Sequence, residues 1–165
     1  MPVTVEKPVI TLISDEIFAR LQSLVSGGSG PYSFVNVVRP TKLATYTPQH
    51  GLIVLTRGEQ IRAPELDCPG NPPSICWQQT FLIRVHIAPS ERDETPVEVF
   101  EDFAQAEIIK AIRNSATWHT LGGNAINAQF EPMVTTTSDG GYDGVAVAVN
   151  VVYRVAEDDP YTVRA

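Results

Sequence analysis

A period of two is most regular near the C-terminus, in Val145-Ala146-Val147-Ala148-Val149-Asn150-Val151-Val152-Tyr153-Arg154-Val155. Every second residue is valine or tyrosine, and the positions between carry mainly small or polar residues. Because successive side chains of a strand point to opposite faces of a sheet, this pattern predicts a long strand with one buried face. The stretch 77–87 repeats the pattern, with one face made of Trp77, Phe81, Ile83, Val85 and Ile87. His86 falls on the opposite face, where we expect it to be exposed.

Three further stretches predict shorter strands, namely 32–39, 51–56 and 125–136. The last of these is followed by Ser138-Asp139-Gly140-Gly141, residues that favour turns. We therefore expect 125–136 to form a closing hairpin with the long C-terminal strand.

Two stretches have helical periodicity instead. In 96–113 the apolar residues recur at steps of three and four and form one stripe, made of Val97, Phe100, Ala104, Ile108 and Ala111. Thr95 is predicted to cap this helix and Pro96 to be its first residue. In 9–25 the same spacing links Ile10, Ile13, Ile17, Leu21 and Leu24. The start of this earlier helix stays open between Pro8 and a cap at Ser14.

The order of elements predicts an α+β fold, because strands follow one another without the regular alternation of parallel βα units. We expect an antiparallel or mixed β-sheet with the two helices packed on one face. The 165 residues suit a single domain. Within it, 62–75 is predicted as a long Pro-rich loop, suited to be a docking arm, and 156–165 as a C-terminal tail.

The charge of the chain argues against a general nucleic-acid binder. Asp and Glu number 19 against 12 Lys and Arg, a formal net charge of −7. The sequence contains no run of about 18 apolar residues that would predict a membrane span, and its first residues do not look like a signal peptide. We expect a soluble protein that folds in a reducing cytosol.

Residues with catalytic or metal-binding chemistry do not form a recognised motif. Cys68 and Cys76 lack the further ligands of a zinc site, and their pairing as a disulfide stays open. The three histidines are dispersed, and the glycine-rich segment 27–30 precedes a strand rather than a helix. The expectation is therefore a binding protein with no cofactor and no metal, and not an enzyme.

The ending of the chain resembles the closing strand of tail terminator proteins of tailed bacteriophages. The resemblance rests on the sequence Val151-Val152-Tyr153-Arg154-Val155-Ala156-Glu157-Asp158-Asp159-Pro160-Tyr161. The order of the other elements agrees, including a strand ending in Arg39-Pro40, the strand Gly51-Leu52-Ile53-Val54 and the amphipathic helix after Thr95.

This resemblance implies a structural virion protein, assembled in the host cytoplasm, that forms a ring of about six copies. Such a ring caps the tail tube and joins the tail to the head and neck. Its partners would be other copies of itself, the tail tube protein and a head–neck connector protein, while DNA passes through the lumen without specific binding. The matching residues that could contact partners are Tyr153, Arg154, Asp159, Pro160 and Tyr161.

A ring with unlike contacting surfaces also needs complementary charges. Acidic residues cluster at 91–94, with Glu91, Asp93 and Glu94, and at 157–159. They could oppose basic residues, for which the candidates are Arg39, Lys42, Arg57 and Arg62. Two alternatives remain: another neck component, such as a head-completion or connector protein, and a small thiol- or metal-dependent enzyme.

Overall fold

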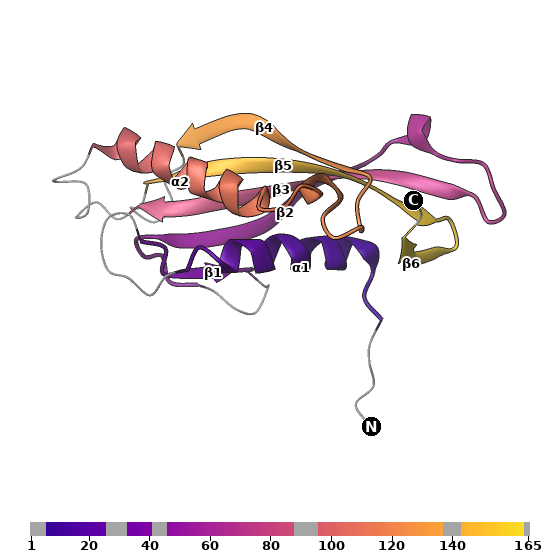
Figure 1. The fold of residues 1–165 in the computed structure, drawn as a ribbon, viewed down its shortest axis with the longest axis horizontal. Coiled ribbons are helices and arrows are strands. Elements are labelled where there is room, and N and C mark those ends of the chain that lie inside the picture. The colour runs from indigo at the N-terminus through magenta and orange to yellow at the C-terminus, as the bar shows by residue number, and fades with distance from the viewer. Residues whose placement is uncertain (1–5, 26–32, 41–45, 88–95, 137–142, 164–165) are drawn as a thin grey trace, which may run out of the picture.

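Figure 1 shows the fold in a computed structural model, which describes residues 6–25, 33–40, 46–87, 96–136 and 143–163. The two helices are α1 (Val9–Gln22) and α2 (Val97–Ile112), and two short 3-10 turns are η1 (Pro64–Leu66) and η3 (Trp118–Thr120). The strands are β1 (Asn36–Val38), β2 (Leu52–Arg62), β3 (Ser74–Ile87), β4 (Asn127–Thr136), β5 (Asp143–Ala156) and β6 (Asp159–Val163). The predicted α+β class is confirmed.

The strands form one mixed sheet in the order β1-β2-β3-β5-β4, with β6 paired to β5. β1 runs parallel to β2, and the other pairs are antiparallel. The two long alternating stretches of the sequence, β3 and β5, lie side by side at the centre, where Phe81 pairs with Val149. The predicted pairing of β4 with β5 is also confirmed.

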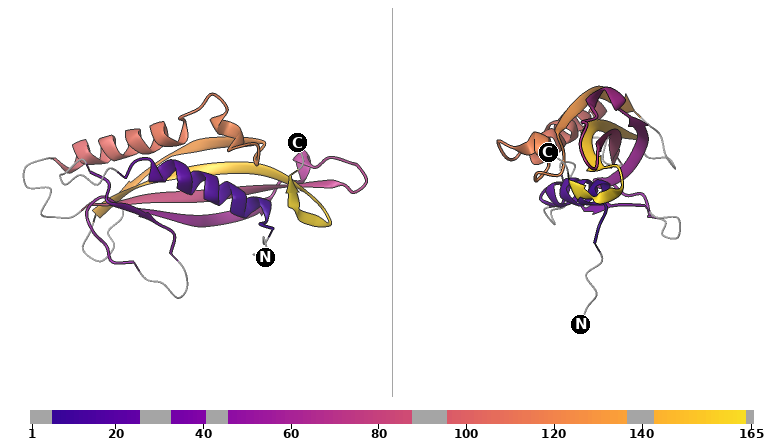
Figure 2. Two further views of the ribbon diagram at one scale, coloured as in Figure 1. Left: turned by 60° about the horizontal axis from the view of Figure 1, so that its bottom comes forward. Right: turned by 90° about the vertical axis from the view of Figure 1, so that its right-hand side faces the viewer.

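Both helices pack on one face of the sheet, which curls around them in the end-on view of Figure 2. The core between the layers joins apolar residues of α1 and α2 to alternate residues of β2, β3 and β5. Its most enclosed side chains include Ile13, Ile17, Leu21, Phe81, Ile83, Ile108 and Ile112. The helical stripes and the alternating strand residues of the sequence therefore form the two sides of one core, the first from α1 and α2 and the second from the sheet.

Both helices begin immediately after a proline. Pro8 and Pro96 occupy the N-cap positions, so the prediction that Pro96 is the first helical residue is wrong by one position. Proline fits here because its extended backbone leads into the helix and the cap N–H is not needed inside it. Thr95 lies outside the described residues. α1 starts at Val9, and Ser14 is buried inside it rather than capping a shorter helix.

His86 differs from its prediction, because it is buried with 1% of its surface exposed. It does lie on the sheet face opposite Val85 and Ile87. The ring of Tyr46, from the segment that leads into β2, packs edge-on against it with 5.7 Å between ring centres. A covering segment, which the alternation of one strand cannot reveal, therefore buries part of the second face.

The predicted loop 62–75 corresponds to the connection 63–73 between β2 and β3. β2 continues to Arg62 and β3 starts at Ser74, so the two strands form a long hairpin that extends beyond the helices (Figure 1). The connection contains η1, and Cys68 pairs with Ser74 in an isolated bridge. We call this extension, residues 58–78, the hairpin arm.

The predicted C-terminal tail contains a strand, since β6 folds back on β5 through the turn at Glu157 and Asp158. Val163 packs against the hydrophobic core at its edge. Removing β6 would therefore expose part of that edge, and single substitutions are better probes of this region than deletions.

Candidate functional site

The described residues include no group of three or more His, Cys, Asp or Glu side chains able to hold a metal ion. Cys68 and Cys76 are both free thiols, and Cys76 is buried near the start of β3. No helix in the described part of the chain is long and apolar enough to cross a membrane.

Tyr153, one of the predicted contact residues, is buried with 4% of its surface exposed. Its hydroxyl accepts a hydrogen bond of 2.7 Å from the side-chain amide of Gln60 on β2. Burial raises the pKa of Tyr153 above its ordinary value of 10.0. In this structure Tyr153 is a buried residue that connects β5 to the hairpin arm through Gln60.

Arg154 points to the opposite face and holds the tip of the hairpin arm. Its guanidinium donates to the carbonyl oxygen of Leu66 at 3.0 Å and to the sulfur of Cys76 at 3.4 Å. These bonds connect β5 to η1, which lies 88 residues earlier in the chain. The sequence offered no signal for this contact.

Asp159, Pro160 and Tyr161 lie together on β6. The carboxylate of Asp159 accepts hydrogen bonds from the backbone N–H of Tyr161, at 2.9 Å, and from the hydroxyl of Thr162. Pro160 is exposed, and Tyr161 as a residue is 42% exposed. These residues therefore present a fixed surface beside the turn at 157–158.

The other acidic candidates, Glu91, Asp93 and Glu94, lie outside the described residues, as does Lys42. The basic candidates Arg39, Arg57 and Arg62 are described. Arg62 pairs with Asp67 inside the hairpin arm and stacks over Trp77. Arg39 and Arg57, in contrast, come together in one cavity.

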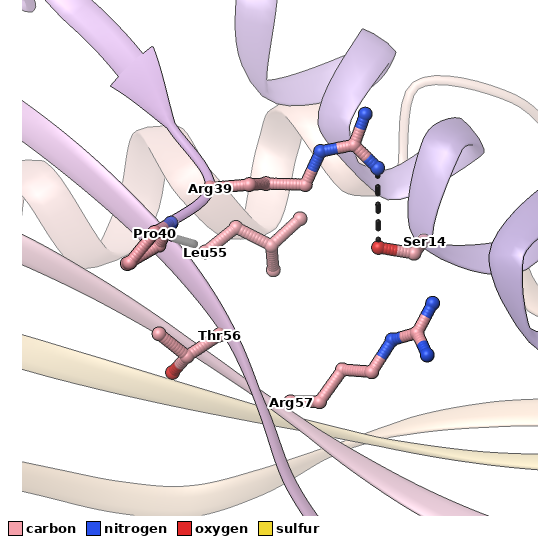
Figure 3. Close-up of a pocket in the computed structure, with 6 residues that line it drawn as sticks. All are labelled: Ser14, Arg39, Pro40, Leu55, Thr56 and Arg57. Carbon is pink, nitrogen blue, oxygen red and sulfur yellow. Dashed lines mark hydrogen bonds between the residues drawn. The ribbon is translucent and has the colours of Figure 1, made fainter. Parts of the chain in front are cut away.

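This cavity, which we call the arginine pocket, has a volume of about 410 Å³ and lies between α1, the end of β1 and the middle of β2. Its lining residues are Ser14, Arg39, Pro40, Leu55, Thr56 and Arg57. Figure 3 shows both guanidinium groups reaching towards α1, with Leu55 between the two side chains. Two guanidinium groups and the Ser14 hydroxyl thus line an open pocket, and none of its described lining residues is acidic.

Arg39 is fixed by α1. It forms an ion pair of 2.6 Å with Asp15, donates to the Ser14 hydroxyl at 3.4 Å and lies 4.4 Å from the centre of the Phe18 ring. Asp15 also pairs with Lys7 at 2.6 Å. Hydrogen bonds from Lys7 and then Arg39 hold the pKa of Asp15 below its ordinary value of 3.8.

Arg57 is held more loosely, by a long 3.4 Å hydrogen bond to the Thr11 hydroxyl. Among the residues that the structure describes, no carboxylate forms an ion pair with Arg57. Most of its guanidinium N–H groups therefore remain available to an incoming acceptor, and a carboxylate suits this planar fork.

The pocket also lies at an open edge of the sheet. β1 pairs only with Leu52, Ile53 and Val54 of β2, and Pro40 follows shortly after it. Beyond Val54, the outer edge of β2 has no strand partner in the described part of the chain. An edge of this kind offers backbone donors and acceptors to another chain.

Asp15→Asn tests the ionic support of the pocket. Because the pKa of Asp15 is lower in the folded protein than in the unfolded chain, its ionised carboxylate stabilises the fold at pH values above the pKa of the unfolded state. This stabilisation disappears as the pH falls through the pKa of the folded state. When the pH is lowered from 7 to about 2.5, the free energy of unfolding of the wild type should fall by up to about 1 kcal/mol more than that of Asp15→Asn. Urea unfolding at both pH values measures this. Asp102→Asn, at an exposed position on α2, is the control and should lose as much free energy of unfolding between the two pH values as the wild type does. If Asp15→Asn and the wild type depend equally on pH, Asp15 does not support the pocket through its charge.

A second surface lies at the end of the molecule that carries the hairpin arm. Four of the six large hydrophobic residues that are exposed in the described structure belong to it, namely Ile61, Leu66, Ile126 and Tyr161. Arg154 connects this group, because it binds the carbonyl of Leu66 and lines a cavity of about 360 Å³ with Ile126 and Val163. We call the four exposed residues the apolar end.

Neither a comparison with protein-family models nor a comparison with curated proteins finds a match to this chain.

Proposed function

We propose that the protein is a structural virion component that forms a ring, caps the tail tube of a tailed bacteriophage and joins the tail to the head and neck. The resemblance of 151–161 to tail terminators suggests the role, and the α+β fold with two helices is the class that the resemblance implies. The role requires binding surfaces and no catalysis.

The apolar end is the observation that carries the proposal. Isolated apolar residues are ordinary on a protein surface, but several of them at one end of the molecule are typical of a site that docks on another protein, and two of the four, Ile61 and Leu66, lie on the projecting hairpin arm. Ile61, Leu66 and Tyr161 are each more than 40% exposed. In a ring, every copy would present this end in the same direction, towards the tail tube or the connector.

The acidity of the chain fits a ring around DNA. With a net charge of −7 per copy, a lumen that carries part of the excess acid repels the phosphate backbone and lets DNA slide. In this account DNA is a passenger of the ring and not a specific ligand.

Replacing Ile61 and Leu66 by serine tests the docking role of the apolar end. We expect this double variant to keep the ring mass of the wild type in native mass spectrometry. Its binding to either tail tubes or the connector should fall about tenfold or more, as expected for the loss of central apolar contacts. Sedimentation with each partner measures the binding.

Val99→Ser is the matched control, because Val99 is 47% exposed but lies on α2, away from the arm. Unchanged binding of the Ile61/Leu66 variant to both partners would show that the apolar end does not dock. A wild-type protein that stays monomeric at all concentrations would contradict the ring itself.

A further inference from the structure

We propose that the ring closes by insertion of the acidic turn between β5 and β6, at Glu157 and Asp158, into the arginine pocket of the neighbouring copy. The inference rests on the proposed ring and names the contact that would build it. It assigns one occupant to the pocket, namely carboxylate side chains of a second copy of this chain.

The receiving side has the chemistry of a carboxylate site. Arg57 contributes a guanidinium without a described carboxylate partner, and Arg39 is held in place by Asp15 and Phe18. Ser14 adds a hydroxyl group on the α1 side of the pocket. The outer edge of β2 beyond Val54, which has no strand partner among the described residues, adds backbone groups. An approaching carboxylate can therefore meet charge-assisted and neutral donors together.

The donating side is exposed and already fixed in shape. Glu157 and Asp158 are exposed, and no described residue forms a hydrogen bond or ion pair with either carboxylate. The turn itself is anchored, because the Glu157 N–H donates to the carbonyl of Pro73 at 2.9 Å and Asp159 binds residues of β6. A turn held in this way loses little conformational freedom on binding.

The two surfaces differ, and this difference determines the type of assembly. A contact between a pocket on one copy and a turn on the next is heterologous, so it repeats around a ring until the rotation closes. No described hydrogen bond or ion pair joins the turn to the pocket within one copy. Both sides therefore remain available for contact between copies.

Two variants test the contact, one with a changed arginine pocket and the other with a changed acidic turn. Arg57→Glu disables the pocket and keeps the turn, whereas Glu157→Lys with Asp158→Lys disables the turn and keeps the pocket. Because like charges would then meet at every contact, each variant alone should need at least about tenfold more protein for half assembly. Native mass spectrometry and sedimentation over a concentration series measure assembly.

The mixture of the two variants gives the decisive result. In an equimolar mixture every contact can join opposite charges, either acid to arginine or lysine to glutamate, so assembly should return to near the wild-type concentration. Lys110→Glu, an exposed charge reversal on α2, controls for net charge and should assemble normally. Unfolding curves check that each variant folds.

The possible outcomes separate this inference from the proposed function. If the wild type does not assemble, the ring fails and this contact fails with it. If the wild type assembles and both variants assemble equally well, or if the mixture of non-assembling variants is not rescued, only the contact is wrong. Normal assembly of Arg57→Glu with lost retention on immobilised DNA would instead assign the pocket to phosphate and overturn the proposal.

Discussion

Replacing Phe81 by alanine should lower the free energy of unfolding by about 3–5 kcal/mol. Phe81 has 0% of its surface exposed and is the largest fully buried side chain among the described residues. It lies on β3 at the centre of the sheet, between Arg57 of β2 and Val149 of β5 in the strand register. Strands on both sides restrict the collapse of the cavity that alanine would leave, so the cost should lie well above that of an average substitution.

Urea denaturation followed by circular dichroism measures the effect. Phe81→Leu, which keeps most of the apolar volume, should cost much less, about 1–1.5 kcal/mol. Phe130→Ala is a second control, because Phe130 is only partly buried at the edge of the core. A loss below about 1 kcal/mol for Phe81→Ala would contradict the core described here.

Replacing Arg20 by alanine should cost about 2–3 kcal/mol. Arg20 is 9% exposed, and its guanidinium binds one group of α1, the last carbonyl of α2 and a side chain just beyond α2. It donates to the carbonyl of Ile112 at the end of α2, to the side chain of Asn114 at 3.1 Å, and to Glu16 at 2.8 Å. A cation at this position satisfies a free helix carbonyl and favours the negative end of the α2 dipole.

Arg20→Lys separates charge from geometry. Lysine retains the positive charge but cannot direct several N–H groups from one planar fork, so we expect about half of the loss. Exchange of backbone amides in the last turn of α2 should also become faster in Arg20→Ala. Unchanged stability together with unchanged exchange at that turn would show that Arg20 does not connect the helices.

The alternating pattern predicted the centre of the sheet but not its extensions. Alternate residues of β3 and β5 belong to the hydrophobic core between sheet and helices, so sequence periodicity located these strands well. The outer half of β2, from Arg57 to Arg62, is exposed on both faces and contains one large apolar residue, Ile61, so it carries no alternating signal. β6 was missed because its first residues, Asp159 and Pro160, are typical of turns.

For Tyr153, the alternation of the sequence predicts burial, whereas the resemblance to tail terminators suggested a residue that contacts partners. Tyr153 continues the series of Val149 and Val151, and this series predicts the buried face. The structure accordingly places its ring in the core. Periodicity was the better guide to exposure, because it reflects the physical requirement of a buried sheet face.

The arginine pocket could not be predicted from one sequence. Arg39 and Arg57 were both candidate basic residues, but nothing in their spacing indicates that they meet. They meet because β1 pairs in parallel with the start of β2 and leaves the edge of β2 open beyond Val54. Long-range pairing of this kind depends on the packing of the whole fold and not on local propensity.

Electron microscopy of the wild-type protein mixed with isolated tail tubes tests the central claim most directly. The account predicts a ring of about six copies at one end of each tube, with the apolar end facing either the tube or the connector side. Tubes whose ends stay bare, or protein distributed along the tube wall, would contradict it.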